Sequence, residues 1–500
     1  MNNRYLIVAL LLKRRLRFIG DLKMSYQDYE CVIGLEIHAQ LKTQSKMFSA
    51  DSTQFEAADN AHTSIVSVGM PGALPTPNRL GVELAIKTGL ALGCTIRERS
   101  VFARKNYFYP DLPKGYQISQ YDEPLCENGR VIYLLDGAKK EVRIVRAHLE
   151  EDAGKSVHIG DASLINFNRS GIPLLEVVSA PDMRSPREAA QYAKSLRQIL
   201  RYIGVCDGNL EEGSMRCDCN ISVRKKGETR LGTKVEIKNI NSFRFVEKAL
   251  EYEFERQVTL LHSGQAIVQE TRLWDPDKNR TFSMRIKEDA DDYRYFPDPD
   301  LLPLVVSSSY IEGLKKQLPE LPLERFERFQ KQYGLPSYDA EILTEEKEIA
   351  DYFERAVVVC GNPKAVSNWM MTDLMRLLND QKLDINQCPI SSESLGELVQ
   401  LIDSGTISGK IGKTLINEMW DTGRRPKQIV EEKGLVQISD EKVIEGIIDA
   451  VLKDHSHAVA EYRSGKTKSF GFLVGQIMKA CKGQANPQKV NELLKKKLES

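Results

Sequence analysis

The stretch GLEIHAQL, residues 34–41, alternates apolar and polar side chains in the way that a β-strand with one buried face does. Because successive side chains of a strand point to opposite faces, Glu36 and His38 should share one face and the apolar residues around them the other. The stretch therefore predicts a core strand with an acid and an imidazole on its polar side. An ordinary half-solvated antiparallel strand shows the same alternation, so this strand alone leaves both interpretations open.

Two later stretches repeat this mixture of residues. RCDCNISVR, residues 216–224, places Asp218 on the face of Arg216. TKVEIKNINSF, residues 233–243, places Glu236 between two lysines. Hard cations take oxygen ligands, and phosphates need compensating positive charge. Three such strands predict a magnesium and phosphate site on a sheet, and therefore an ATP-using enzyme.

The acidic run HLEEDAGKSVH, residues 148–158, contains Glu150, Glu151 and Asp152 in succession. Adjacent like charges are unfavourable unless solvent or a cation screens them, so the run favours a cation site. Periodicity does not fix its register, and which carboxylate points inward stays open.

Composition limits the classes of protein to consider. A chain of 500 residues exceeds the usual reach of one core, so about two or three domains are expected. Seventy basic and seventy acidic residues cancel, which excludes a globally basic nucleic-acid coat but allows a local basic patch. The nine cysteines lack a disulfide-like spacing, which is typical of reduced thiols. Cys217 and Cys219 should lie together on the apolar face of their strand, where we expect core packing rather than metal binding.

Periodicity and turn residues divide the chain into four segments. Residues 1–24 hold an apolar run too short to span a bilayer, and we expect a disordered or loosely helical extension, with Met24 as the natural start. Residues 25–318 predict an α+β domain with an antiparallel-rich sheet. Residues 319–433 predict a helical domain, and residues 434–500 a small, lysine-rich helical tail domain. Helices in the first domain are expected over 79–92, 186–203 and 243–261.

Known nucleotide-binding loops are missing from the sequence. Three Gly-Lys-Ser/Thr triplets lack the earlier glycine of a phosphate-binding loop, and there is no dinucleotide-binding or kinase signature. We therefore expect ATP to bind through carboxylate-held magnesium on the sheet.

Long motifs carry a resemblance to a known family. In chain order they are VIGLEIHAQL, RKNYFYPDLPKGYQISQ, HLEEDAGK, FNRSGIPLLEVVSAPDMRS, EEGSMRCDCNISVR, GTKVEIKNINSF and the tail AEYRSGKTKSFGFLVGQIMKACKGQANPQKVNELLKKKL. These segments resemble the B subunits of aspartyl/glutamyl-tRNA amidotransferases, from about Tyr29 to the C-terminus. The resemblance implies that residues 25–318 form a catalytic cradle domain and that residues 434–500 form a tRNA-binding tail.

The resemblance also implies an activity. The enzyme would use ATP to phosphorylate the side-chain carboxylate of Glu-tRNA(Gln), Asp-tRNA(Asn) or both, and ammonia would then displace the phosphate. The chain has no amidase signature, so ammonia would come from an amidase A subunit in a heterotrimer with a small C subunit. We expect no membrane association and a bacterial cytoplasmic location, with the mitochondrial matrix as the alternative. Which charged tRNA is the physiological substrate stays open.

Roles for individual residues follow from this resemblance. The expected magnesium ligands are Glu36, His38, Glu151, Asp218 and Glu236. These five residues and Lys238 form the expected catalytic set, in which His38 could instead orient a carboxylate or a metal-bound water. Positive or polar groups expected to bind ATP are Lys105, Arg216, Asn239 and Asn241. The lysines expected to contact tRNA are Lys479, Lys482 and Lys489, although a lysine-rich helix can also be only a solvated surface.

The sequence departs from the pattern of the family that it resembles at one point. Many relatives hold zinc with two cysteine pairs, where this chain has Ser49, Asp51, Ser64 and Ser67. Serine is a poor zinc ligand, so we expect no zinc and a loop held by packing alone.

Two other functions compete with this interpretation. The first is a non-catalytic tRNA-binding adaptor, in which the acidic sheet would be purely structural. The second is a free-standing ligase for a small carboxylic acid, against which the long helical half argues, because a small substrate needs no such reach.

Overall fold

The computed structural model describes residues 26–286, 293–435, 441–481, 485 and 487–499. The chain divides into two compact units, Met1–Leu323 and Glu324–Ser500, which are described separately. The predicted extension over residues 1–24 lies outside the described residues. The predicted boundary between helical and tail domains at 433 and 434 stays a prediction.

The first unit is built on a nine-stranded sheet. From one edge to the other its strands are β14 (Arg280–Ile286), β13 (Glu270–Asp275), β12 (Val235–Lys238), β11 (Met215–Lys225), β1 (Tyr29–Gln40), β10 (Pro173–Ser179), β7 (Ala138–Glu151), β6 (Cys126–Leu135) and β2 (Thr95–Ile96). Neighbouring strands are antiparallel except for the parallel pair β12 and β13. The predicted α+β fold with an antiparallel-rich sheet is confirmed.

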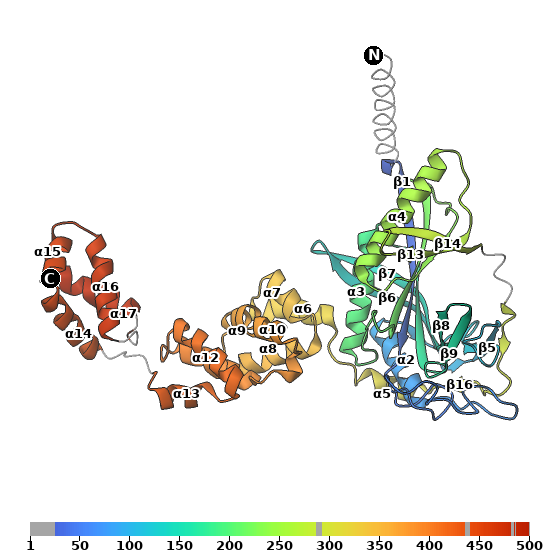
Figure 1. The fold of residues 1–500 in the computed structure, drawn as a ribbon, viewed down its shortest axis with the longest axis horizontal. Coiled ribbons are helices and arrows are strands. Elements are labelled where there is room, and N and C mark those ends of the chain that lie inside the picture. The colour runs from blue at the N-terminus through green and yellow to red at the C-terminus, as the bar shows by residue number, and fades with distance from the viewer. Residues whose placement is uncertain (1–25, 287–292, 436–440, 482–484, 486, 500) are drawn as a thin grey trace, which may run out of the picture. The chain divides into compact units, whose positions relative to one another are not determined.

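Helices α2 (Arg79–Ala91), α3 (Pro186–Tyr202) and α4 (Phe243–His262) match the three predicted helices. Each begins after a residue whose side chain accepts a hydrogen bond from the first turn, namely Asn78, Ser185 and Ser242. Figure 1 shows α3 and α4 running along the sheet. Their apolar stripes, with that of α2, bury the inner face of the sheet in one hydrophobic core.

The sheet strands place their apolar and polar residues as predicted. Leu35 and Ile37 of β1 are fully buried in the core, whereas Glu36 and His38 point to the other face and are partly exposed. Cys217 and Cys219 of β11 are buried, with their Sγ atoms 4.0 Å apart, which agrees with the predicted core packing. The core therefore fixes the strands that present the polar face.

Three smaller sheets complete the unit. β4 (Ala103–Asn106) lies between β5 (Tyr116–Ser119) and β15 (Phe296–Pro297). β8 (Lys155–Ile159) pairs with β9 (Ala162–Asn166), and β3 (Arg99–Ser100) pairs with β16 (Leu304–Val305), which precedes helix α5 (Ser308–Lys315).

The second unit is helical. Its first part consists of α6 (Pro322–Tyr333), α7 (Ser337–Leu343), α8 (Lys347–Cys360), α9 (Pro363–Trp369), the π-helical turn Met370–Leu374, α10 (Met375–Gln381), α11 (Ser392–Asp403), α12 (Gly409–Thr422) and α13 (Pro426–Lys433). Glu354 of α8 accepts hydrogen bonds from Arg325 and Arg328 of α6, beside the buried rings of Phe329 and Phe353.

The last helices form a hydrophobic cluster of their own. They are α14 (Glu441–Asp454), α15 (Ser456–Arg463), α16 (Lys468–Ala480) and α17 (Pro487–Glu499). Ile444, Ile448, Leu473, Ile477 and Leu494 are fully buried among them. Across the part of the chain that the structure describes, no helix is both long and apolar enough to cross a bilayer.

Candidate functional site

Strand register brings four polar residues into one row across the sheet. His38 on β1 lies opposite Arg216 on β11 and opposite Glu176 on β10, and Glu176 in turn lies opposite His148 on β7. Directly opposed side chains on one face are close enough to interact. Segments more than a hundred residues apart thus meet at one place on the polar face.

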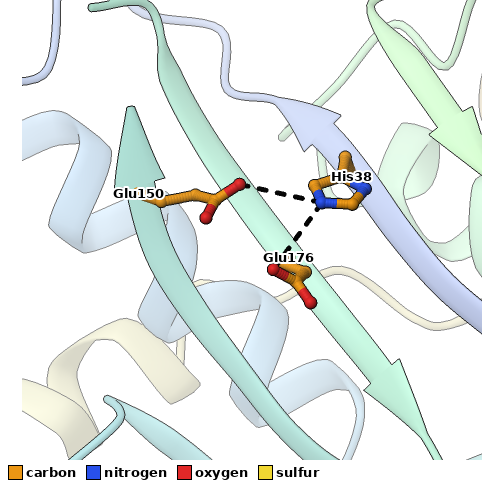
Figure 2. Close-up of side chains that lie close together, drawn as sticks. All are labelled: His38, Glu150 and Glu176. Carbon is orange, nitrogen blue, oxygen red and sulfur yellow. Dashed lines mark ion pairs between the residues drawn. The ribbon is translucent and has the colours of Figure 1, made fainter. Parts of the chain in front are cut away.

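Two residues of this row, His38 and Glu176, form a cluster with Glu150 of β7 (Figure 2). His38 Nε2 lies 3.7 Å from a carboxylate oxygen of Glu150 and 3.6 Å from one of Glu176. The three ligand atoms all lie within 4.8 Å of one another, and both carboxylates are buried. Among the described residues this is the only group of three or more histidine, cysteine or acidic side chains whose ligand atoms come so close. Two carboxylates and an imidazole suit a hard divalent cation.

The pKa values in the cluster reflect crowded charges. Burial and the neighbouring Glu176 raise the pKa of Glu150 to about 7. Burial also opposes ionisation of Glu176, but a hydrogen bond with His38 and the positive charges of His38 and Lys105 hold the pKa of Glu176 well below the usual range. Burial would lower the pKa of His38, yet Glu176 and Glu150 raise it to about 9. His38 is therefore protonated at neutral pH in this metal-free arrangement, and it must lose that proton to become a ligand.

The second histidine of the row stays neutral. Burial lowers the pKa of His148 to about 4, even though its Nε2 lies 3.4 Å from a carboxylate oxygen of Glu176. His148 therefore contributes a hydrogen-bonding ring rather than a charge.

A second acidic group lies beside the first, on β1, β11 and β12. Glu36 is directly opposite Asp218, and Glu236 is opposite Asn220. Lys238 Nζ donates to Asp218 at 2.5 Å and lies 3.3 Å from Glu236. The predicted residues Glu36, Asp218, Glu236 and Lys238 therefore share one neighbourhood.

This second group contains one buried side-chain oxygen that has no hydrogen-bond partner among the described residues. Asn220 Nδ2 donates to Glu36 at 2.9 Å, whereas Asn220 Oδ1 is buried with no hydrogen-bond partner in the described chain. An unsatisfied buried oxygen next to carboxylates fits a cation or the donor group of a ligand.

Glu151 does not join these groups. It follows Glu150 on β7, so the alternation of the strand sends its side chain the other way, where it accepts from Lys114 and from the Ile118 backbone N–H. Glu150 and Glu176 were not among the predicted site residues. A lone glutamate in the apolar strand PLLEVVS was the signal for Glu176, because a buried acid needs a partner.

The predicted phosphate-binding residues occupy different positions. Arg216 lies at the end of the row and donates to Asp152 at 2.9 Å. The ammonium of Lys105, on β4, interacts electrostatically with Glu150 and Glu176, which raise its pKa against the effect of burial. Asn239 instead donates to the Trp274 carbonyl oxygen at 3.0 Å, and Asn241 is exposed just before α4. The structure brings neither asparagine to the clusters.

Of the lysines predicted to contact tRNA, Lys479 is exposed on α16 and Lys489 lies on α17. Lys482 lies outside the described residues.

The four residues at the expected zinc positions form a hydrogen-bonded cluster. The hydroxyls of Ser49 and Ser64 each donate to Asp51 Oδ2 at 2.8 Å, and Ser67 donates to the Ser64 carbonyl at 3.1 Å. The prediction that packing alone holds this loop is therefore wrong. Three serine hydroxyls beside one carboxylate do not fit zinc, whose structural sites are built from thiolates and imidazoles.

Comparison with known proteins gives the same family over nearly the whole chain. The GatB/GatE catalytic domain family matches residues 31–312, and the GatB domain family matches residues 351–498. The B subunit of the aspartyl/glutamyl-tRNA(Asn/Gln) amidotransferase of Bdellovibrio bacteriovorus is 63% identical over 95% of this chain and 100% of its own length. The proteins of the same name from Thermodesulfovibrio yellowstonii and Geotalea daltonii are 57% and 55% identical, over 93% and 94% of this chain and 98% and 100% of their own lengths. With identity at this level across both units, the chain belongs to the family of aspartyl/glutamyl-tRNA(Asn/Gln) amidotransferase B subunits.

Proposed function

We propose that this chain uses ATP to activate the side-chain carboxylate of glutamate or aspartate carried on Glu-tRNA(Gln) or Asp-tRNA(Asn), so that ammonia can convert it to an amide. The observation that carries this proposal is the cluster of His38, Glu150 and Glu176 on the polar face of the sheet. A protein that served only to hold tRNA would have no use for buried carboxylates forced together.

The chemistry explains why activation is required. A carboxylate is a poor electrophile, because attack on it builds more negative charge and must expel oxide. When a carboxylate oxygen attacks the γ-phosphorus of ATP, ADP leaves and an acyl phosphate forms. Ammonia then attacks the carbonyl carbon, and phosphate leaves with the bonding electrons.

Glu150, Glu176 and deprotonated His38 would hold one magnesium ion, with Glu36, Asp218 and Glu236 available for another. Bound magnesium would neutralise charge on the phosphate oxygens. On β7 we assign this role to Glu150 instead of Glu151, because only Glu150 faces His38. The raised pKa of Glu150 supports the assignment, since two buried anions side by side repel until a cation joins them.

Lys105, Arg216 and Lys238 would supply the positive charge that the transferring phosphoryl group needs. Each already lies beside carboxylates of the two clusters. Lys238 is held by Asp218 and Glu236 in a fixed place, which avoids reorganisation during the reaction.

The other components of the reaction follow from membership of the family. The related proteins are named as B subunits, and we propose that this chain works with an amidase A subunit and a small C subunit. The amidase would supply ammonia from glutamine. A bacterial cytoplasm is the location that we propose, and zinc is not expected to take part.

A reconstituted complex tests this function. With ammonium as the nitrogen donor, ATP hydrolysis and amide formation should depend on magnesium and on misacylated tRNA. The variants Glu150→Gln and Glu176→Gln should lose both reactions while tRNA still binds. Full activity in both variants would favour the adaptor interpretation, in which the acidic sheet is only structural.

A further inference from the structure

A pair of stacked tyrosines, Tyr121 and Tyr295, has no role in the site described so far. The rings of Tyr121 and Tyr295 are parallel within 5°, with their centroids 4.2 Å apart. Tyr121 follows β5 and Tyr295 precedes β15, so two segments far apart in the sequence form the pair. Tyr121 is 47% exposed, although one of its ring faces covers Tyr295.

The stack continues toward the cluster through other aromatic rings. Tyr295 contacts Tyr293, with the ring centroids 6.2 Å apart. The ammonium of Lys105 lies 4.9 Å from the ring centroid of Tyr293 and 5.9 Å from that of Tyr107. Both Lys105 and Tyr295 interact electrostatically with Glu150 and Glu176. An exposed ring, a cation and the carboxylate cluster therefore follow one another along this surface.

The ammonium and phenolic groups of this aromatic surface make no hydrogen bonds or ion pairs with other described residues. Among the described residues, none forms an ion pair or a hydrogen bond with the Lys105 ammonium. The same holds for the phenolic oxygens of Tyr121, Tyr293 and Tyr295. A half-buried ammonium that is held by rings and has no anionic partner in contact is a donor available to a ligand.

We propose that the exposed face of Tyr121 stacks on the adenine base of an adenosine, whose ribose and phosphate then pass Tyr295 toward Lys105 and the carboxylates. This inference rests on the proposed function, which brings two adenosines to the site: that of ATP and the 3′-terminal adenosine of the charged tRNA. Both present the same ring to an aromatic side chain, because every base has a π-face. Tyr121 and Tyr295 are positioning residues in this account, since they touch the base and not the reacting atoms.

The test uses the reconstituted complex with ammonium as donor and compares Tyr121→Ala, Tyr121→Trp and Phe282→Ala. Phe282, on β14, is 43% exposed and serves as a matched aromatic control. Tyr121→Ala should raise the KM of one adenosine-bearing substrate about tenfold with little change in kcat, as expected for the loss of one stacked base. Tyr121→Trp should keep the wild-type KM, and so should Phe282→Ala.

The KM values for ATP and for tRNA show which of the two adenosines stacks on Tyr121. A raised KM for ATP alone assigns the base of ATP, and a raised KM for misacylated tRNA alone assigns its terminal adenosine. Unchanged KM values for both substrates in Tyr121→Ala would overturn the proposal, and so would an equal loss in Tyr121→Trp.

Failure of the underlying function would look different. In that case the wild-type complex would form no amide with ATP and ammonium, or Glu176→Gln would be fully active. Failure of the stacking proposal alone leaves the wild-type activity and the Glu176→Gln defect intact.

Discussion

The substitution Glu176→Gln tests the centre of the proposed site. The amide keeps the shape of the side chain and removes its negative charge. One carboxylate oxygen of Glu176 lies 3.6 Å from His38 Nε2 and 3.4 Å from His148 Nε2, and the residue is buried. The change therefore removes one anionic ligand from the cluster and also the strongest electrostatic partner of His38.

The size of the effect can be worked out from these distances. Two unit charges about 4 Å apart interact by about 4 kcal/mol at an effective dielectric constant of about 20. Water at a partly open site and the dipole of the new amide reduce that value. We expect the apparent affinity for magnesium, and with it the rate at limiting magnesium, to fall about 100-fold, which corresponds to about 2.7 kcal/mol.

The assay is a magnesium titration of ATP-dependent amidation in the reconstituted complex, with ammonium as donor. Asp136→Asn is the control, because Asp136 is an exposed carboxylate paired with Arg187 in the same unit. In the metal-free protein, Glu176→Gln should also lower the pKa of His38 from about 9 toward 6.5, which NMR titration measures. A wild-type magnesium dependence together with an unchanged His38 pKa would refute the assignment.

Four further predictions follow from other parts of the chain. Asp218→Asn and Glu236→Gln should each lower the steady-state rate of ATP-dependent amidation about 100-fold or more while the complex still assembles, and wild-type rates would remove both residues from the site. Glu354→Gln should lower the calorimetric unfolding temperature at pH 7 but not near pH 2. Burial opposes ionisation of Glu354, yet hydrogen bonds from two arginines and a tyrosine lower its pKa to about 2. The ionised carboxylate therefore stabilises the fold fully above pH 4.5, and this stabilisation is lost as the pH falls from 4.5 to about 2. Asp51→Ala should reduce the free energy of unfolding, measured in urea, by about 1–3 kcal/mol, because two hydroxyls lose their acceptor. A chelator should not change the free energy of unfolding of the wild-type protein. A lower value in the presence of the chelator would reveal a bound metal. Deletion of residues 434–500 should raise the KM for tRNA and flatten the salt dependence of tRNA binding by about one unit of slope for each tRNA phosphate that the tail no longer neutralises. Replacing the three predicted lysines together should reproduce part of this effect. Identical affinity and slope for the truncated and full-length proteins would show that the tail does not contact tRNA.

The central strands were predictable because their signal is local. Alternation along GLEIHAQL assigns Leu35 and Ile37 to the core and Glu36 and His38 to the opposite, polar face from eight consecutive residues, and the structure agrees. The same holds for the helix starts, where Asn78 accepts a hydrogen bond within three residues of its own position. No knowledge of the rest of the fold is needed for such assignments.

Two residues of the cluster, Glu150 and Glu176, were missed because strand pairing decides which side chains meet. Glu150 and Glu151 are adjacent, and only the pairing of β7 with β10 decides which of them faces His38. A shift of one residue in that pairing exchanges the two side chains between faces. Glu176 lies in an apolar strand that alternation cannot divide into faces, and it meets His38 only because the strand order places β10 beside β1.

The loop at residues 49–67 shows a different limit of sequence reasoning. Serine is a poor zinc ligand, and the expectation that packing alone holds the loop followed from that property. Asp51 changes the outcome, because one carboxylate can accept from two hydroxyls at once and so joins Ser49 to Ser64. A hydrogen-bonded cluster of this kind needs the folded loop to be recognised.

The arrangement of charge also bears on the choice between an enzyme and an adaptor. Folding places Glu150 close to Glu176 and raises the pKa of Glu150 to about 7, so the two carboxylates repel each other in the folded protein. In a purely structural sheet this repulsion would bring no advantage, because apolar residues of similar volume would pack at the same positions without repelling each other. A site that must bind a divalent cation and phosphate reversibly gains two closely spaced carboxylates that attract the cation. The repulsion between the two carboxylates without a cation is therefore an argument for catalysis. It also predicts that magnesium should raise the unfolding temperature of the wild-type chain more than that of the Glu176→Gln variant.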